Sequence, residues 1–295
     1  MDLPDFAGRA AATGADGVGL CRLEIIIANG GIHPAEYIRQ GKTQDYINLL
    51  KEGVGKIAKA FDGKPVWVRC SDLRSDEYRN LKGGDLEPRE TDPMIGWHAI
   101  RRLLDEPAIL KAEFEAIREL HYAGQKNVGI MLPFVINVDE VRRAKEILRE
   151  VGLEPCKAID FGVMIETPAS CWIIEDLCKE GISFVSFGTN DLTQTTLGIS
   201  RDDSGKFLND YIDNKIFDVD PFVSIDQSGV GELVELASTR GRKVNKKLKL
   251  GICGEHGGDP KSIDFCSRTG LDYVSCSPFR VPVARLAAAQ AELRK

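Results

Sequence analysis

The sequence predicts an α/β protein built as a (β/α)8 TIM barrel that lacks its first strand within this chain. Short apolar runs alternate with longer segments of helical periodicity, which is the pattern of repeated β-α units around a parallel sheet. Most of the runs are apolar at every position, as expected for strands buried on both faces. Polar residues gather where the runs end, as they do at the mouth of such a barrel.

Seven apolar runs are predicted strands. They lie at 17–24, 65–72, 127–135, 160–167, 183–191, 248–255 and 273–278. A complete barrel has eight strands. A predicted helix at 4–13 precedes the first run, so we expect the missing strand to lie outside this sequence. An open, doubly wound sheet is the alternative arrangement.

Apolar residues at three- and four-residue spacing predict two helices, one over 46–61 and one over 138–148. The alanine-rich final segment, 281–294, is also expected to be helical. Prolines suited to a first helical turn and glycines suited to a helix end mark further boundaries at Pro168, Pro260, Gly152 and Gly270.

The composition excludes several classes of protein. The 295 residues are 43% hydrophobic and 28% charged, without an apolar run long enough to cross a membrane. The formal net charge is −6, which gives no positive field to attract nucleic acid. A single barrel routinely reaches this length, so residues 1–295 are predicted to form one domain.

The eight cysteines form no C-x-x-C pair, and most lie in apolar runs. We interpret them as reduced residues that pack like small hydrophobic side chains. The first residues, MDLPDFAGRAAATG, do not have the pattern of a secretory signal. The expected location is therefore the cytoplasm.

Charged and polar residues of both signs follow five of the seven runs. They are Arg22 and Glu24, Arg69 and Asp72, Glu166, then Thr189, Asn190 and Asp191, and finally Cys253, Glu255 and His256. Stability alone does not explain such a set, because buried unpaired charges are costly. The sequence therefore predicts an active site at the carboxyl ends of the strands.

Two pairs in this set suggest an anionic substrate and a metal. Arg22 and Arg69 follow adjacent strands, where two guanidinium groups bind phosphate or carboxylate oxygens. Glu166 and Asp191 supply two hard oxygen ligands of the kind that Mg²⁺ prefers. The alternative is that these two carboxylates only neutralise the arginines.

Cys253 lies in the string GICGEHGG, which predicts a glycine-flanked turn with an accessible thiol. A thiol in such a turn is a candidate nucleophile or general acid and base. The alternative is an ordinary core cysteine, with His256 contributing to the shape of the loop rather than to chemistry.

Eight ordered strings resemble the phosphoenolpyruvate-binding barrel that is shared by phosphoenolpyruvate (PEP) synthase, pyruvate phosphate dikinase and Enzyme I of the sugar phosphotransferase system. They are ADGVGLCRLE, VRCSDLRSDEYRNLKGG, DPMIGW, IMLPF, GVMIETPAS, FGTNDLTQTTLGISRDD, GICGEHGGDP and YVSCSPFRVPVARLAAAQA. The resemblance covers almost the whole chain. The first half is closer to the synthase, and several later strings are closer to the dikinase.

The resemblance implies a role for each candidate residue. Arg22, Arg69 and Arg201 would bind the phosphoryl group, and Glu166 and Asp191 would coordinate Mg²⁺. Gly188, Thr189, Asn190 and Asp191 would contact the substrate. Cys253 would move the proton of the pyruvate methyl group. The implied reaction interconverts pyruvate and PEP by exchanging a phosphoryl group with a phosphohistidine on another domain.

Two departures from the family pattern affect this expectation. His98 in GWHAIR stands where the family usually has arginine, and Arg101 is a candidate to compensate. None of the four histidines lies in a phosphohistidine motif. The phosphohistidine and ATP-binding domains are therefore expected on another segment or chain, and the family also implies a homodimer.

Four functions follow as hypotheses. A synthase-like domain (pyruvate, water dikinase) is preferred, and a domain of pyruvate phosphate dikinase is the alternative. A non-catalytic PEP-binding module is the third hypothesis, suggested by His98 and the absent domains. A lyase or aldolase that uses Mg²⁺ and the same enolate chemistry is the fourth.

Overall fold

The computed structural model describes Met1 and residues 3–294. Within these residues seven strands form one sheet in the order β1-β2-β3-β4-β5-β6-β7. Every pair with a defined register is parallel. The strands are β1 (Val18–Arg22), β2 (Val66–Arg69), β3 (Val128–Leu132), β4 (Phe161–Ile165), β5 (Phe184–Gly188), β6 (Lys249–Cys253) and β7 (Tyr273–Val274).

Strands that follow one another in both sequence and space, with helices between them, are the α/β architecture of a (β/α)8 barrel. The predicted fold class is confirmed, with seven of the eight strands in the described residues. A doubly wound sheet would require the strand order to reverse, and it does not. The described segment before β1 is helical, as predicted: η1 (Pro4–Phe6) leads into α1 (Ala7–Ala12).

The chain divides into two compact units, which are described separately: Met1–Phe134 with Val138–Gly162, and Val135–Asn137 with Val163–Lys295. The first contains the helices α1, α2 (Glu24–Gly30), α3 (Pro34–Arg39), α4 (Thr43–Ala60), α5 (Ala99–Asp105), α6 (Pro107–Tyr122) and α7 (Val138–Glu150). The second contains α8 (Pro168–Trp172), α9 (Ile174–Glu180), α10 (Thr189–Leu197), α11 (Leu208–Asp213), α12 (Glu232–Val244), α13 (Pro260–Thr269) and α14 (Val281–Glu292).

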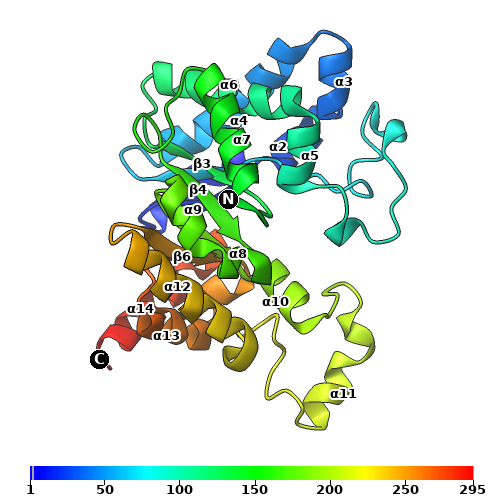
Figure 1. Ribbon diagram of the computed structural model, residues 1–295. Helices are drawn as coiled ribbons and strands as arrows, with labels where there is room; N and C mark the ends of the chain where they lie inside the picture. Colours follow the sequence, from blue (N-terminus) through cyan, green and yellow to red (C-terminus); the bar gives the residue numbers. More distant parts are fainter. Residues whose placement is uncertain (2, 295) are drawn as a thin grey trace. The chain divides into compact units, whose positions relative to one another are not determined.

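Short helical turns complete the two units. They are η1, η2 (Gly84–Leu86) and η3 (Pro93–Ile95) in the first, and η4 (Ser204–Lys206), η5 (Gln227–Gly231), η6 (Glu255–Gly258) and η7 (Pro278–Arg280) in the second. Within the first unit α4 packs against α6, and within the second α13 packs against α14. In Figure 1 α13 and α14 lie side by side in the orange to red part of the chain.

Burial explains why the strands were readable from sequence. Strands β2, β3, β4 and β5 are buried at every position. The helices expected over 46–61 and 138–148 are α4 and α7. Pro168 and Pro260 occupy first helical turns, and Gly270 ends α13 in the left-handed conformation.

All seven strands are shorter than the predicted runs, and at β5, β6 and β7 the residues that follow the strand explain the difference. The run 183–191 ends as a strand at Gly188, and the residues after it form the first turn of α10. The run 248–255 ends at Cys253, because Gly254 turns the chain with a φ of 97°. The run 273–278 is a strand over Tyr273–Val274 only, and Pro278 begins η7.

Candidate active site

The two predicted phosphate-binding arginines end neighbouring strands of the first unit. Arg22 and Arg69 are the last residues of β1 and β2, and they are partners in the register of this pair. Arg69 is buried and Arg22 is half-buried. Because paired parallel strands place aligned residues side by side, the backbone presents both arginines at the same end of the sheet.

Two carboxylates fix the guanidinium of Arg69. Glu24, the first residue of α2, lies with Oε1 3.0 Å from Nη2, and Asp72 lies with Oδ2 3.2 Å from Nη1. Glu24 Oε1 also accepts the backbone N–H of Asp72 at 2.7 Å. Burial alone would raise the pKa of Asp72, but Arg69 and His98 outweigh it and hold this pKa at about 2. Asp72 is therefore ionised at neutral pH.

His98, at the position where the family pattern has arginine, is buried and oriented by Asp72. The distance from His98 Nδ1 to Asp72 Oδ1 is 2.6 Å. An ionised carboxylate only accepts hydrogen bonds, so Nδ1 carries the proton. The ring meets Phe134 edge-on at 4.6 Å. His98 Nε2 is buried and has no hydrogen-bond partner among the described residues, so it is a candidate ligand contact.

The backbone around His98 is strained. Ala99 and Phe134 have φ values of 56° and 52°, a left-handed conformation that non-glycine residues rarely adopt. Such strain concentrates at functional sites. Arg101 donates from Nη1 to the carbonyl oxygens of Ile95 and Gly96, and its guanidinium lies 5.2 Å from the Phe134 ring centre.

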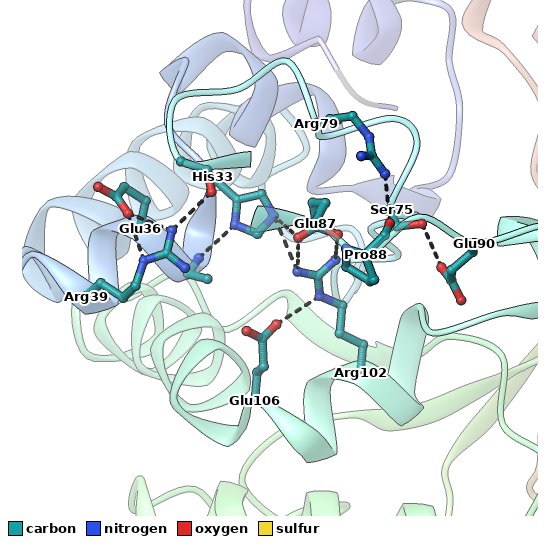
Figure 2. A network of polar contacts seen from close by, with 12 residues as sticks. His33, Glu36, Arg39, Ser75, Arg79, Glu87, Pro88, Glu90, Arg102 and Glu106 are labelled. Carbon is teal, nitrogen blue, oxygen red and sulfur yellow. Dashed lines mark hydrogen bonds and ion pairs between the residues drawn. The ribbon is translucent and has the colours of Figure 1, made fainter. Parts of the chain in front are cut away.

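A buried ionic network holds the long segment between β2 and α5, which carries Asp72 and His98. Figure 2 shows its centre, Glu87, between His33 and Arg102. Arg102 donates to both carboxylate oxygens of Glu87 at 2.9 and 2.6 Å, and His33 Nε2 lies 3.0 Å from Oε1. His33 Nδ1 accepts the N–H of Ala35 at the start of α3, so the proton is on Nε2.

Replacing Glu87 with glutamine is expected to destabilise the protein by about 3 kcal/mol at pH 7, because the buried Arg102 would keep Glu106 but lose the carboxylate that accepts two of its hydrogen bonds. Burial opposes ionisation of Glu87, but His33 and Arg102 hold its pKa at about 2. A depressed pKa stabilises the fold above the unfolded value, and the contribution is lost as pH falls toward 2. The difference between the variants should therefore shrink below about pH 4.5.

Urea denaturation of the wild type and Glu87→Gln between pH 7 and pH 3.5 measures this difference. Glu36→Gln is the matched control, since Glu36 pairs with Arg39 at an exposed site and should change stability little. A pH-independent difference would contradict the assigned ionisation of Glu87.

In the second unit, the two predicted metal ligands come from neighbouring strand ends. Glu166 follows β4 and is buried, and Asp191 lies in the first turn of α10. The hydroxyl of Thr195 lies 3.3 Å from the carbonyl oxygen of Glu166 and 2.7 Å from that of Asp191. The backbone carbonyl groups of Glu166 and Asp191 therefore lie close to one another, on either side of the Thr195 hydroxyl.

Gly188, the last residue of β5, makes room for the Glu166 carboxylate. A Cβ at this position would lie 2.6 Å from Glu166 Oε2, closer than real contacts allow. Asp191 Oδ1 accepts a hydrogen bond from Gln194 at 3.0 Å, and Gln194 Oε1 accepts the N–H of Arg201 at 2.7 Å. Gln194 thus ties the exposed turn of Arg201 to Asp191.

The donor atoms of Glu166 and Asp191 are of the kind that a magnesium ion uses. Mg²⁺ uses one or two protein carboxylates and keeps several water ligands. Glu166, in the space left by Gly188, and Asp191 are such a pair. Among the residues that the structure describes, no three His, Cys, Asp or Glu side chains gather as a metal cage, which a structural zinc site would need.

Cys253 ends β6, directly beside Gly188 in the register of β5 and β6. Its side chain is buried, and Sγ donates to the carbonyl oxygen of Phe187 at 3.5 Å. The prediction of an accessible thiol in a turn was wrong, because the strand continues to this residue and the turn begins at Gly254. The thiol is nevertheless at the carboxyl end of its strand, as the site requires.

His256 shapes this end of the second unit. It is fully buried, and burial lowers its pKa, so the imidazole is neutral at pH 7. Nε2 lies 2.9 Å from the carbonyl oxygen of Pro221, and Nδ1 lies 2.6 Å from the hydroxyl of Thr189. The neutral ring therefore donates to Pro221 and accepts from Thr189.

The predicted substrate contacts at the start of α10 lie next to Cys253 and His256. Thr189 Oγ1 is 3.0 Å from the carbonyl oxygen of Cys253, so Thr189 and Cys253 are neighbours. Asn190 Oδ1 is buried without a hydrogen-bond partner among the described residues. A Cβ on Gly254 would come within 3.1 Å of that oxygen, so glycine preserves the space around it. Glu255, unlike these buried residues, is exposed, and its Oε2 lies 3.7 Å from Nη1 of Arg280.

Sequence reasoning missed two buried acids of the first unit, Glu87, described above, and Glu113. Glu113 on α6 accepts hydrogen bonds from Ser71 and Tyr46. The available signal was helical periodicity, because Leu110, Glu113 and Ile117 share one face and a carboxylate stands in the middle of it.

The chain is similar to known proteins over almost its whole length. The family model described as "PEP-utilising enzyme, PEP-binding domain" matches residues 1–293. The chain belongs to this family. A probable phosphoenolpyruvate synthase of Pyrococcus horikoshii is 46% identical over 292 residues, covering 98% of this chain and 34% of that protein. The pyruvate, phosphate dikinase of Clostridium symbiosum is 37% identical over 332 residues, covering 99% of this chain and 38% of that protein.

This PEP-binding domain spans about a third of the length of the curated relatives it matches. The resemblance noted from the sequence strings is confirmed at the level of the family. Among solved structures, a citrate lyase of Burkholderia xenovorans matches 81% of this chain and 63% of its own with a TM-score of 0.44 and 14% identity.

Proposed function

We propose that this PEP-binding domain interconverts pyruvate and PEP by exchanging a phosphoryl group with a phosphohistidine on another domain. The family match over residues 1–293 carries the proposal. Relatives named as synthase and as dikinase both cover almost the whole chain, and the synthases have the higher identity. A role like that of pyruvate, water dikinase is therefore preferred, with pyruvate phosphate dikinase as the alternative.

Each candidate residue has a role that its chemistry supports. Arg22 and Arg69 would hold the phosphoryl oxygens. Because Nδ1 of His98 carries the proton that faces Asp72, the buried Nε2 would accept a hydrogen bond from a hydroxyl of the ligand or of water. Glu166 and Asp191 would hold Mg²⁺, which would stabilise the negative charge of the enolate.

The remaining predicted contacts belong to the second unit. The backbone of Gly188, the Thr189 hydroxyl, the Asn190 amide and the Asp191 carboxylate would contact the substrate, as the family pattern implies. Arg201 is exposed, with its backbone tied to Gln194, and is proposed to bind phosphate.

In the direction of PEP formation, the thiolate of Cys253 would take a proton from the pyruvate methyl carbon. The enolate oxygen would then attack phosphorus, forming a P–O bond as the P–N bond to the histidine breaks. In reverse, the thiol would return the proton to the methylene carbon. Atoms and charges balance without an oxidant or reductant.

Several wider expectations belong to the same proposal. Residues 1–295 would act as one domain, with the phosphohistidine and ATP-binding domains on another segment or chain. A homodimer could form through the exposed apolar residues of η7 and α14, which are Phe279, Val283 and Leu286. No described helix is long and apolar enough to span a membrane. We still expect the protein to act in the cytoplasm and not to bind nucleic acid.

Exchange of the pyruvate methyl protons with deuterium, followed by NMR, tests the function without the partner domain. We expect exchange in the presence of Mg²⁺ and its loss after chelation. PEP binding without exchange would contradict catalysis and favour the non-catalytic module. Carbon–carbon bond cleavage without a phosphohistidine partner would favour a lyase or aldolase.

A further inference from the structure

Glu113 is a fully enclosed carboxylate beneath the turn that follows β2. Its residue is 1% exposed. Oε2 accepts the backbone N–H of Ser71 at 3.1 Å, and Oε1 accepts the Ser71 hydroxyl. The hydroxyl of Tyr46, on α4, donates to Oε1 at 3.2 Å. Two of the three bonds hold a single residue, Ser71, by both its backbone and its side chain.

Ser71 lies between Arg69, at the end of β2, and Asp72, the acid that orients the Arg69 guanidinium. The next residue, Asp72, donates its backbone N–H to Glu24 and contacts Arg69 and His98 through its carboxylate. The turn is therefore held by Glu113 at Ser71 and by Glu24 at Asp72. A shift of Ser71 would move Asp72 and, with it, the guanidinium of Arg69.

We propose that Glu113 is a positioning residue, whose carboxylate fixes Ser71 and through Asp72 sets the orientation of the substrate-binding Arg69. The hydrogen bonds of Glu113 described above go to Ser71 and Tyr46 rather than to Arg69, so Glu113 is not itself a catalytic residue. The inference rests on the proposed function for the identity of the anion, and on the contacts above for the positioning.

The charge of Glu113 is expected to change near neutral pH. Burial raises its pKa to about 7, the hydrogen bonds from Ser71 lower it, and the nearby charge of Glu24 raises it further. The other groups that face it stay neutral. Burial, followed by the charge of Glu113, raises the pKa of Tyr46 and of Cys70 well above their usual values.

Ionised Glu113 accepts all three hydrogen bonds, and charge-assisted bonds are about twice as strong as neutral ones. Protonation converts one acceptor into a donor and weakens the hold on Ser71. The turn should therefore be best ordered above pH 7.

The first measurement needs no substrate. In the free protein, the NMR signal of the Arg69 Nε–H group should shift with pH at the same midpoint as the ¹³C carboxyl signal of Glu113. In Glu113→Gln this midpoint should disappear from the Arg69 signal. An Arg69 signal that ignores the titration of Glu113 would overturn the positioning role, whatever the protein binds.

The second measurement compares PEP binding by the wild type and Glu113→Gln from pH 6 to 8.5. The ratio of the two Kd values cancels the titration of the substrate phosphate. We expect the variant to bind about fivefold more weakly at pH 8.5 and equally at pH 6. A ratio that does not vary with pH would also contradict the inference.

Two further variants complete the design. Ser71→Ala keeps the backbone N–H bond and should show a smaller loss of the same pH-dependent kind. Glu119→Gln lies on the same helix, where Glu119 pairs with Lys51, and should leave binding and its pH dependence unchanged. A wild type that fails to bind PEP at any pH would overturn the proposed function, while the Arg69 signal still decides the role of Glu113.

Discussion

Replacing Cys253 with alanine is expected to slow exchange of the pyruvate methyl protons by about 100- to 10,000-fold, the usual contribution of a positioned acid or base. PEP should still bind with similar affinity. The reason is geometric, since Cys253 ends β6 beside Gly188, whereas the arginines proposed to bind the anion end β1 and β2. Its loss removes the group that carries the proton and leaves Arg22 and Arg69 in place.

Cys178→Ala is the matched control for this experiment, because Cys178 is buried like Cys253 but lies in the helix α9 rather than at a strand end. Exchange is followed by NMR, and PEP binding by calorimetry. Normal exchange in Cys253→Ala would show that another group moves the proton. Loss of both exchange and binding would indicate that the substitution disturbs the packing around Phe187, whose carbonyl oxygen accepts from Sγ.

Neutralising either predicted metal ligand is expected to abolish the response of the exchange reaction to Mg²⁺. Glu166→Gln and Asp191→Asn keep the shape of each side chain but remove its charge. A bound cation supplies several kcal/mol of charge stabilisation, so we expect exchange to fall at least about a hundredfold. Calorimetric titration with Mg²⁺ should show weaker binding in both variants.

Asp176→Asn provides the control for charge alone, because Asp176 is an exposed residue of α9 that pairs with Lys179. Unchanged Mg²⁺ affinity in both Glu166→Gln and Asp191→Asn would exclude this pair as the metal site. The two carboxylates would then have a structural role, as the alternative interpretation of the sequence held.

The elements read most easily from the sequence were those with strong local patterns. Runs such as 160–167 contain strands that are buried on both faces, so each position had to be apolar. The helix α4 shows its period because one face packs against α6. Gly270 and Pro260 mark the ends of α13 because backbone sterics alone restrict where they fit.

Boundaries at the strand ends were less predictable. Thr189, Asn190 and Asp191 continue an apolar run in sequence, yet they form the first turn of α10. Cys253 is flanked by glycines, which suggested a turn, yet hydrogen bonding to β5 extends the strand through it. In both cases pairing with a neighbouring strand, rather than local propensity, set the boundary.

The sequence by itself determined the class of fold and the family, because periodicity and motif strings are local properties of the chain. It also predicted which strand ends carry the chemistry. Only the tertiary structure decided that Glu113 lies beneath Ser71, that Glu87 is buried between His33 and Arg102, and that Asp72 orients His98. Glu87 lies 15 positions along the chain from Arg102 and 54 from His33. Glu113 lies 42 positions from Ser71, and His98 lies 26 from Asp72. Burial and charge act through distances in space, which the spacing of residues along the chain does not specify.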